Sequence, residues 1–250
     1  MLQARHVLSG SAGKAHVAFT DRWGGYSSGR FSSLNLGRSV GDDDTLVDAN
    51  RSALAAALSL SADKISFVSQ VHGTDVHHVQ TEGDVAEGPQ ADAQITSLAG
   101  IGLAVLTADC VPVALAAPDT GHIGVVHAGR RGMLDGVAVR AVEEMREAGA
   151  RSIFAYIGPS ICPRCYEVPD RMRAEAMEVC PVAGAVSAAG TAAIDVAGGV
   201  AHQLVQAGVE IAEFSRTCTY EASELYSYRR EQTTGRMAVV AWFESRRDTP

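Results

Sequence analysis

The chain has 250 residues, of which 46% are apolar, enough for a substantial core in one large domain or two small ones. Its formal net charge is −8, which argues against a nucleic-acid binder because such proteins need a basic surface. Five cysteines are too few, and odd in number, for a disulfide scaffold. Since no signal peptide or membrane-length apolar run is found, we expect a cytoplasmic protein with reduced thiols and no membrane partner.

In chain order, apolar runs and alternations predict strands, and apolar residues at helical spacing predict helices. Strands are expected at residues 15–20, 65–70, 76–79, 102–106, 111–116, 122–126, 152–157 and 237–243. Helices are expected at residues 45–58, 132–149, 169–179 and 195–208. Residues 23–33 form a loop rich in glycine and serine, and residues 183–193, which are poor in large side chains, are expected to form a surface loop. Strands that alternate with helices, and in places follow one another directly, predict an α/β (α+β) fold with mixed sheets in a single domain, residues 1–250.

Three potential metal ligands follow or end predicted strands, each in a motif of small and polar residues. His72 lies in the motif Q-V-H-G, Cys110 in T-A-D-C and His127 in V-H-A-G. Two imidazoles and a thiolate suit Zn²⁺ or copper, and three protein ligands leave one tetrahedral position open, as in catalytic zinc sites. Each residue alone is more often structural, but the three together favour a metal site and an enzyme.

Other histidines and cysteines have weaker contexts. His77 and His78 are adjacent, so in a strand they point to opposite faces and at most one could join the site. Cys162 and Cys165 form a C-x-x-C pair, which can be half of a zinc ribbon or a redox motif. Because no second pair completes a ribbon and no thioredoxin pattern surrounds it, we expect a turn with incidental, dispensable thiols.

An anion site is the second chemical feature of the sequence. Arg130 and Arg131 follow His127 at the start of a predicted helix, where free N–H groups, the helix dipole and two guanidinium groups would bind phosphate. The alternative is a glycine-rich turn with solvated arginines. Residues 226–236 contain further cations, but spacing does not tell whether they face the same cleft.

In these motifs the chain resembles, over nearly its whole length, the YfiH/YlmD family, whose members are called polyphenol oxidases or laccase-domain proteins, peptidoglycan editing factors and purine nucleoside phosphorylases of the LACC-domain type. The motifs that carry the resemblance are 25–27, 33–37, 40–42, 50–51, 70–73, 107–110, 126–129, 157–159, 165–168, 218–220, 227–230 and 234–236. Two positions depart from the family pattern: Arg130 replaces the usual tryptophan, and Cys162 replaces a common glycine.

The resemblance implies a layered α/β/β/α fold and assigns His72, Cys110 and His127 as the metal ligands. It also implies phosphorolysis of inosine, adenosine and methylthioadenosine, together with deamination of adenosine. The purine nucleoside and phosphate would then be the partners of the site.

The leading hypothesis is a zinc-dependent purine nucleoside phosphorylase with adenosine deaminase activity, with Zn²⁺ as cofactor and Cu²⁺ as the other candidate. Arg131 would hold phosphate or developing charge, Asn35 would position the nucleoside, and Arg51 and Arg229 would contribute to substrate binding. The oligomeric state is not set by the sequence.

Three alternatives stay open. Cys110 and His127 could be the nucleophile and base of a hydrolase that edits a peptidoglycan precursor. A copper-dependent polyphenol oxidase is the second, although a multicopper oxidase needs many paired histidines and the eight histidines here include no His-x-His pair. A non-catalytic metal-binding protein is the third.

Overall fold

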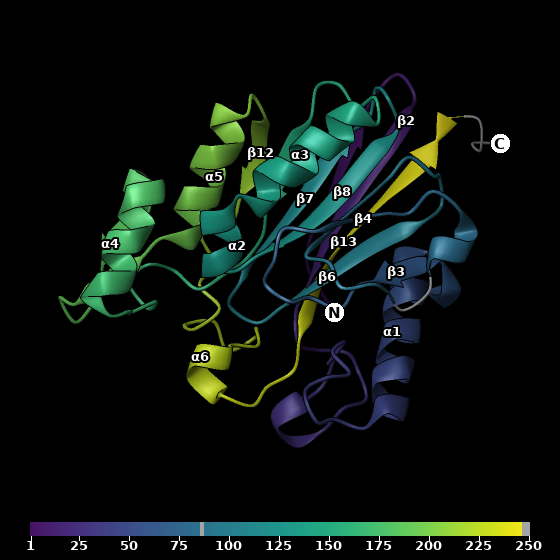
Figure 1. Cartoon of the computed structure of the whole chain (residues 1–250). Helices are drawn as coiled ribbons and strands as arrows, with labels where there is room; N and C mark the ends of the chain where they lie inside the picture. The colour runs from purple at the N-terminus through teal and green to yellow at the C-terminus, as the bar shows by residue number, and fades with distance from the viewer. Residues whose placement is uncertain (86–87, 247–250) are drawn as a thin grey trace.

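Two β-sheets packed face to face form the centre of the molecule (Figure 1). The structure is a computed structural model and describes residues 1–85 and 88–246. The first sheet has the order β1-β2-β13-β6-β3, with β1 Leu2–Ser9, β2 Gly13–Thr20, β13 Met237–Ser245, β6 Gly102–Thr107 and β3 Ile65–Phe67. Its strands are antiparallel except for the parallel pair β3 and β6.

The second sheet has the order β12-β9-β7-β8-β5-β4 and is also mixed. Its strands are β12 Glu210–Phe214, β9 Phe154–Ile157, β7 Val111–Ala117, β8 His122–Ala128, β5 Ala93–Thr96 and β4 Val76–His78. The pairs β12–β9 and β4–β5 are parallel and the other pairs are antiparallel. A separate hairpin is formed by β10 Gly184–Val186 and β11 Ala192–Ile194.

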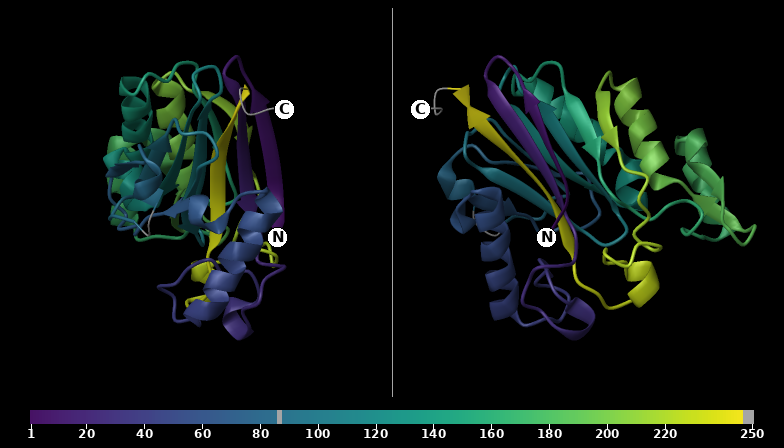
Figure 2. Two further views of the ribbon diagram at one scale, coloured as in Figure 1. Left: turned by 90° about the vertical axis from the view of Figure 1, so that its right-hand side faces the viewer. Right: turned by 180° about the vertical axis from the view of Figure 1, so that it is seen from behind.

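Helices flank the stacked sheets, as an edge-on view shows (Figure 2). They are α1 Asp44–Leu58, α2 Arg130–Asp135, α3 Val137–Glu147, α4 Asp170–Val179, α5 Val196–Gln206 and α6 Tyr228–Glu231, with short 3₁₀ turns at Gly29–Phe31, Ala62–Lys64, Glu82–Val85 and Pro181–Ala183. Helices α2, α3 and α5 cover the outer face of the second sheet, and α1 lies beside β3 of the first sheet (Figure 1). No helix in residues 1–85 or 88–246 is long and apolar enough to cross a membrane.

The alternation of β8 explains how the site is placed. Ile123 and Val125 face the core between the sheets, whereas Val126 and Ala128 face the core under the helices. With a side-chain period of two, His127 falls on the face toward the first sheet, at the end of β8. The strand therefore buries apolar side chains on both faces and delivers one imidazole to the end of the gap between the sheets.

The layered α/β fold with mixed sheets is confirmed, and three expectations on elements need correction. The predicted helix 132–149 is two helices, because Gly136 takes a left-handed conformation with φ +82° between α2 and α3. The predicted loop 183–193 contains the β10–β11 hairpin, whose small side chains pack against α4. Strands β1, β5 and β12 were not predicted, since they are short or lie at sheet edges.

Candidate functional site

Cys110, His72 and His127 converge, although they come from two separate turns and the end of strand β8. One donor atom from each residue lies within 4.8 Å of the other two. Cys110 directly precedes β7, whose Pro112 is paired with His127 of β8, so the register places the thiol and the imidazole at one sheet end. The turn between β3 and β4 brings His72 Nε2 to 3.9 Å from Cys110 Sγ. His127 is buried, Cys110 is half-buried and His72 is exposed, so the cluster opens to one side.

Asp92 is the residue that holds this cluster together. Its carboxylate is fully buried and accepts hydrogen bonds from His127 Nδ1 at 2.8 Å and from the backbone N–H groups of Val71, His72 and Gly73 at 2.7–3.1 Å. Burial opposes the charged form, but these hydrogen bonds outweigh it and lower the pKa of Asp92. One carboxylate thus fixes both the His72 turn and the tautomer of His127, leaving Nε2 of His127 available.

The backbone of the site takes two conformations that are uncommon for residues with side chains. His72 has φ +62° and Asp109 has φ +98°. Asp109 is held there by Thr219 Oγ1, which donates to its carboxylate at 2.6 Å, and by the backbone N–H of Arg229 at 2.7 Å. Surrounding contacts therefore stabilise the turns that present the ligands, as is common at functional sites.

Cys110 and His127 are electrostatically coupled. Burial works to raise the pKa of the Cys110 thiol, but the charge and hydrogen bonds of His127 and His72 outweigh it and lower the pKa to about 6. Burial works to lower the pKa of His127, but the Cys110 charge and the hydrogen bond to Asp92 raise it to about 9. The pair therefore favours a thiolate beside an imidazolium, and a thiolate is the form of cysteine that binds metals.

A cavity of about 830 Å³ opens directly over these three residues. Its wall combines aromatic rings and guanidinium groups: Phe67, Tyr166, Tyr228, Arg38, Arg51, Arg229 and Arg236. Aromatic faces and convergent charged groups are the usual components of a small-molecule site. Asp109 also lines the cavity, but its carboxylate is occupied by hydrogen bonds from Thr219 and Arg229. The four arginines therefore suit an anionic ligand with a flat ring.

The arginines of this wall are positioned by specific contacts. Arg51 donates to Leu36 O at 3.0 Å and lies 3.9 Å over the Phe67 ring. Arg229 donates to Glu167 O at 2.9 Å and lies 4.9 Å over the Tyr166 ring. Stacking on a ring leaves the edge of a guanidinium group available for hydrogen bonds to an oxyanion.

Arg236 and Asn35 are linked at the back of the wall. Arg236 donates to Thr234 O and Gly235 O at 2.9 and 3.0 Å, and burial lowers its pKa. Asn35 is completely buried, and its side chain accepts from the backbone N–H groups of Arg236 and Gly37 and donates to Gly37 O. Asn35 thus positions the cavity wall and is not among the residues that line the cavity.

Arg131 is not brought into the cavity. Its side chain is 75% exposed on α2 and pairs with Asp135 at 3.6 Å, on the surface. Arg130 pairs with Glu175 of α4 at 3.2 Å. Neither arginine of the six-residue α2 is among the residues that line the cavity. The expected phosphate role of Arg131 therefore stays a prediction, and the cavity offers other cations.

Sequence reasoning missed Asp92 and Arg236. Asp92 stands between two alanines at the point where the short strand β5 begins, and a lone carboxylate at that position was the signal that could have identified it. Arg236 belongs to the quoted motif Thr-Gly-Arg, yet nothing in spacing places it near Cys110.

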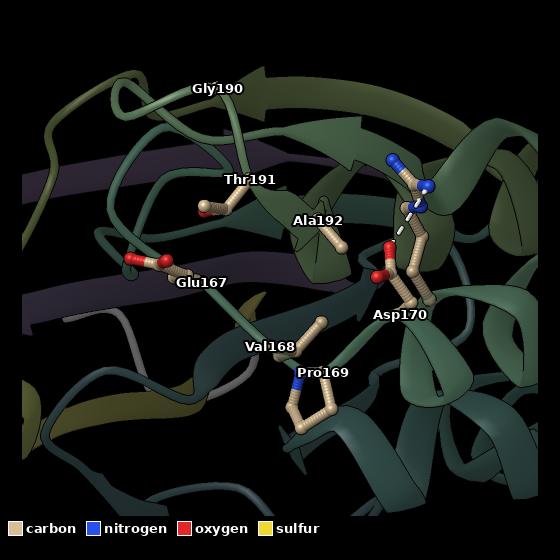
Figure 3. A pocket seen from close by; sticks show the side chains of 8 residues that line it. Glu167, Val168, Pro169, Asp170, Gly190, Thr191 and Ala192 are labelled. Carbon is tan, nitrogen blue, oxygen red and sulfur yellow. Dashed lines mark hydrogen bonds and ion pairs between the residues drawn. The ribbon is translucent and has the colours of Figure 1, made fainter.

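A second hollow of about 610 Å³ lies where α4 begins, against β11 (Figure 3). Asp170 and Arg173, three positions apart in α4, pair at one side of it at 3.4 Å, as the dashed line in Figure 3 marks. Neither group of potential metal ligands in the described part of the chain lies there. The chemistry therefore points to the cavity over Cys110.

The donor set at that cavity fits a metal ion. A tetrahedral zinc ion with bonds of about 2.0–2.3 Å separates its ligand atoms by roughly 3.3–3.8 Å, close to the spacing found here. A Cβ on Gly129 would lie 2.8 Å from His72 Cδ2 and 3.1 Å from Cys110 Sγ, so only glycine leaves room for the donors. The Cys and His residues therefore form a site that could hold a metal ion.

A layered α/β fold with a Cys-His site of this kind defines a class of laccase-domain proteins. A family model described as multi-copper polyphenol oxidoreductase laccase matches residues 16–244, and the chain belongs to this family, the YfiH/YlmD family that its motifs resemble.

Two relatives and two solved structures are similar over most of the chain. Purine nucleoside phosphorylase ORF3 of Streptomyces griseus is 46% identical over 243 residues, which is 96% of this chain and 99% of that protein. Purine nucleoside phosphorylase YlmD of Geobacillus stearothermophilus is 38% identical over 242 residues, which is 89% and 88% of the two chains. The structure of that YlmD matches with a TM-score of 0.84 and 35% identity, covering 92% of both chains. The structure of YfiH from Bacillus licheniformis matches with a TM-score of 0.85 and 30% identity, covering 94% and 97%.

Proposed function

We propose that this protein is a purine nucleoside phosphorylase that cleaves inosine, adenosine and methylthioadenosine with phosphate. The observation that carries the proposal is a cavity in which a Cys-His cluster lies beside aromatic rings and four arginines. The names of the curated relatives support the same activity. The rings suit a purine and the arginines suit phosphate.

Phosphorolysis sets clear demands on these groups. A phosphate oxygen attacks C1′ of the ribose, and the bond from C1′ to the purine nitrogen breaks. The electron pair leaves with the purine, which takes up a proton, and the products are the free base and ribose 1-phosphate. Arg229, Arg236 and Arg51 would hold the phosphate, and Tyr166 and Tyr228 would stack on the base.

We propose Zn²⁺ as the ion at His72, Cys110 and His127, with Asp92 holding the His127 imidazole and the backbone of His72 in place. When bound, zinc would supply a Lewis acid beside the reacting groups. Asn35 would act through Arg236, because its side chain accepts a hydrogen bond from the backbone N–H of Arg236. In this way it would position the nucleoside pocket. Hydrolytic deamination of adenosine, in which water replaces the amino group to give inosine and ammonia, is proposed as a second activity of the same cavity.

The test is hypoxanthine release from inosine at increasing phosphate concentration, with identification of the sugar product. We expect dependence on phosphate and formation of ribose 1-phosphate. A charge-assisted hydrogen bond is worth about 1.5–3 kcal/mol, so Arg229→Ala should raise the KM for phosphate roughly ten- to a hundredfold. Arg131→Ala removes the same charge from the exposed surface of α2 and is the matched control.

Two outcomes would change this proposal. Cleavage that proceeds equally well without phosphate and yields free ribose would identify a hydrolase and remove the phosphate role. A large effect of Arg131→Ala, with none of Arg229→Ala, would move the phosphate site to the start of α2, as the sequence predicted.

A Cys-His hydrolase is favoured by one specific observation, namely that Asp92, His127 and Cys110 follow one another like a catalytic triad. A triad of these residues would give His72 no role. It would therefore not explain why Asp92 also fixes the His72 turn. The oxidase alternative rests on the family description, and the described residues hold a single cluster of potential ligands that contains histidine. We therefore favour the phosphorylase.

A further inference from the structure

A second group of potential metal ligands lies apart from the cavity and has four members. Cys162, Cys165, Cys218 and Glu221 each present one donor atom, and these atoms lie within 4.8 Å of one another. All three cysteines are free thiols. The cluster is distinct from the first site, which offers two histidines and one cysteine.

The fold builds this cluster from two turns that are far apart in the sequence. Strands β9 and β12 are parallel neighbours, so the segments that follow them leave the sheet side by side. Ser160 and Cys218 continue the pairing beyond the strands, and Thr219 N donates to Ser160 O at 3.1 Å. The C-x-x-C pair of the first segment therefore meets Cys218 and Glu221 of the second.

Each turn has a backbone that presents its donors inward. Cys165 N donates to Cys162 O at 3.0 Å, which closes a tight turn around the first two thiols. Cys162 N donates to Cys218 Sγ at 3.3 Å, and Cys165 Sγ lies 3.6 Å from Glu221 Oε1. The distance of 3.6 Å between Cys165 Sγ and Glu221 Oε1 falls within the roughly 3.3–3.8 Å that separates the ligand atoms of a tetrahedral zinc ion.

We propose that Cys162, Cys165, Cys218 and Glu221 form a second, structural zinc site. Four protein ligands close a tetrahedron, and closed sites with several thiolates at C-x₂-C spacing are typical of structural zinc. Two turns tied by the ion would need no disulfide. The sequence predicts incidental thiols because no second C-x-x-C pair follows, and spacing alone does not link this pair to a cysteine 56 positions away from Cys162.

The site is placed so that its ion would stabilise the wall of the cavity. Tyr166, which lines the cavity, directly follows Cys165. Thr219 directly follows Cys218 and donates to the carboxylate of Asp109, next to Cys110. An ion that fastens the two turns together would hold both of these residues in position. Its role is therefore structural and its effect on the cavity is indirect.

The test is the zinc content of the purified protein and its variants. We expect two zinc ions per chain in the unaltered protein, and one in a Cys110→Ala, His127→Ala double variant that lacks the first site. A Cys162→Ser, Cys218→Ser double variant should also lose one ion. Cys180→Ser alters a buried cysteine outside both clusters and is the matched control, which should keep two.

A second set of measurements keeps the proposal testable if the double variants misfold. Glu221 is exposed, so Glu221→Gln should leave the fold intact while zinc leaves the cluster faster in the presence of a chelator. In the unaltered protein, zinc should protect Cys162 and Cys165 from alkylation, and chelation should expose them. Neither readout involves nucleoside cleavage, so they remain informative if the proposed function is wrong.

Three results would overturn the proposal. One is a protein that holds a single zinc ion and loses it in the Cys110→Ala, His127→Ala variant. Another is a disulfide between two of the three cysteines, seen as a loss of two hydrogens in the intact mass. The third is alkylation of Cys162 and Cys165 at the same rate with and without chelator.

Discussion

Asp92 has the most demanding role of any single residue in the site. It is fully buried, and its two oxygens receive four N–H groups, one from an imidazole and three from the backbone of the His72 turn. Groups behind metal ligands determine their orientation and basicity. The metal affinity of the cluster should therefore depend on this carboxylate as much as on a ligand.

We expect Asp92→Asn to weaken zinc binding at the first site by about 10- to 100-fold. An amide replaces one acceptor oxygen by a donor, so it cannot accept all four N–H groups. The measurement is competition with a chromogenic chelator. Asp84→Asn is the control, because Asp84 also accepts backbone N–H groups but lies outside both ligand clusters. An unchanged affinity in Asp92→Asn would contradict this role.

A substitution at Gly129 tests whether the metal ligands need the space that this glycine leaves between them. Because a Cβ there would lie 2.8 Å from the His72 ring, Gly129→Ala should displace that ring and weaken zinc binding. Overpacking of this kind costs about 1–3 kcal/mol. Gly73→Ala in the neighbouring turn would meet only atoms at 3.6 Å or more and should bind zinc normally. Equal affinities in the two variants would show that the ligands tolerate the added methyl group.

At the scale of single residues, the sequence predicted the potential metal ligands better than the residues that position them. His72, Cys110 and His127 are soft donors in polar motifs, and residue type alone suggests their chemistry. Arg236 and Asp92 act through contacts made across the fold, with partners up to 201 positions away for Arg236. Such contacts leave no local pattern, so sequence periodicity could not find them.

Helix α5 shows what local sequence determines well among the elements. Asp195 caps its first turn by accepting from Gly198 N at 2.8 Å, and Val196, Val200 and Leu204 bury one face against the second sheet. The capping aspartate and the spacing of the apolar residues are both visible in the sequence, and they predict the helix nearly to its ends. The β10–β11 hairpin carries no such signal, because its strands are short and its side chains are small.

We expect Asp195→Ala to lower the free energy of unfolding by about 0.5–2 kcal/mol, because loss of the cap leaves Gly198 N without its partner. Urea unfolding followed by circular dichroism is the measurement. Asp195→Asn keeps a capping oxygen and should retain most of the stability. If both variants unfold at the same urea concentration as the unaltered protein, the cap contributes nothing to the fold.

On the scale of the whole molecule, the stacked sheets bring the functional groups together. The cavity is lined from the segment after Leu36, the β3–β4 turn, the β6–β7 turn, the end of β8 and the segment around α6. No pair of these segments is adjacent in the sequence. The layered class of fold followed from the order of strands and helices and from the family resemblance, whereas the arginine wall required the tertiary structure.

The central claim is that His72, Cys110 and His127 act as one metal centre for phosphorolysis. The most direct measurement is phosphate-dependent hypoxanthine release from inosine by the unaltered protein and by His72→Ala, after chelation and again after zinc is added back. We predict that chelation abolishes the activity of the unaltered protein, that zinc restores it, and that His72→Ala stays inactive at all zinc concentrations. Activity that survives chelation, persists in His72→Ala and is lost on alkylation of Cys110 would contradict the claim and identify Cys-His catalysis.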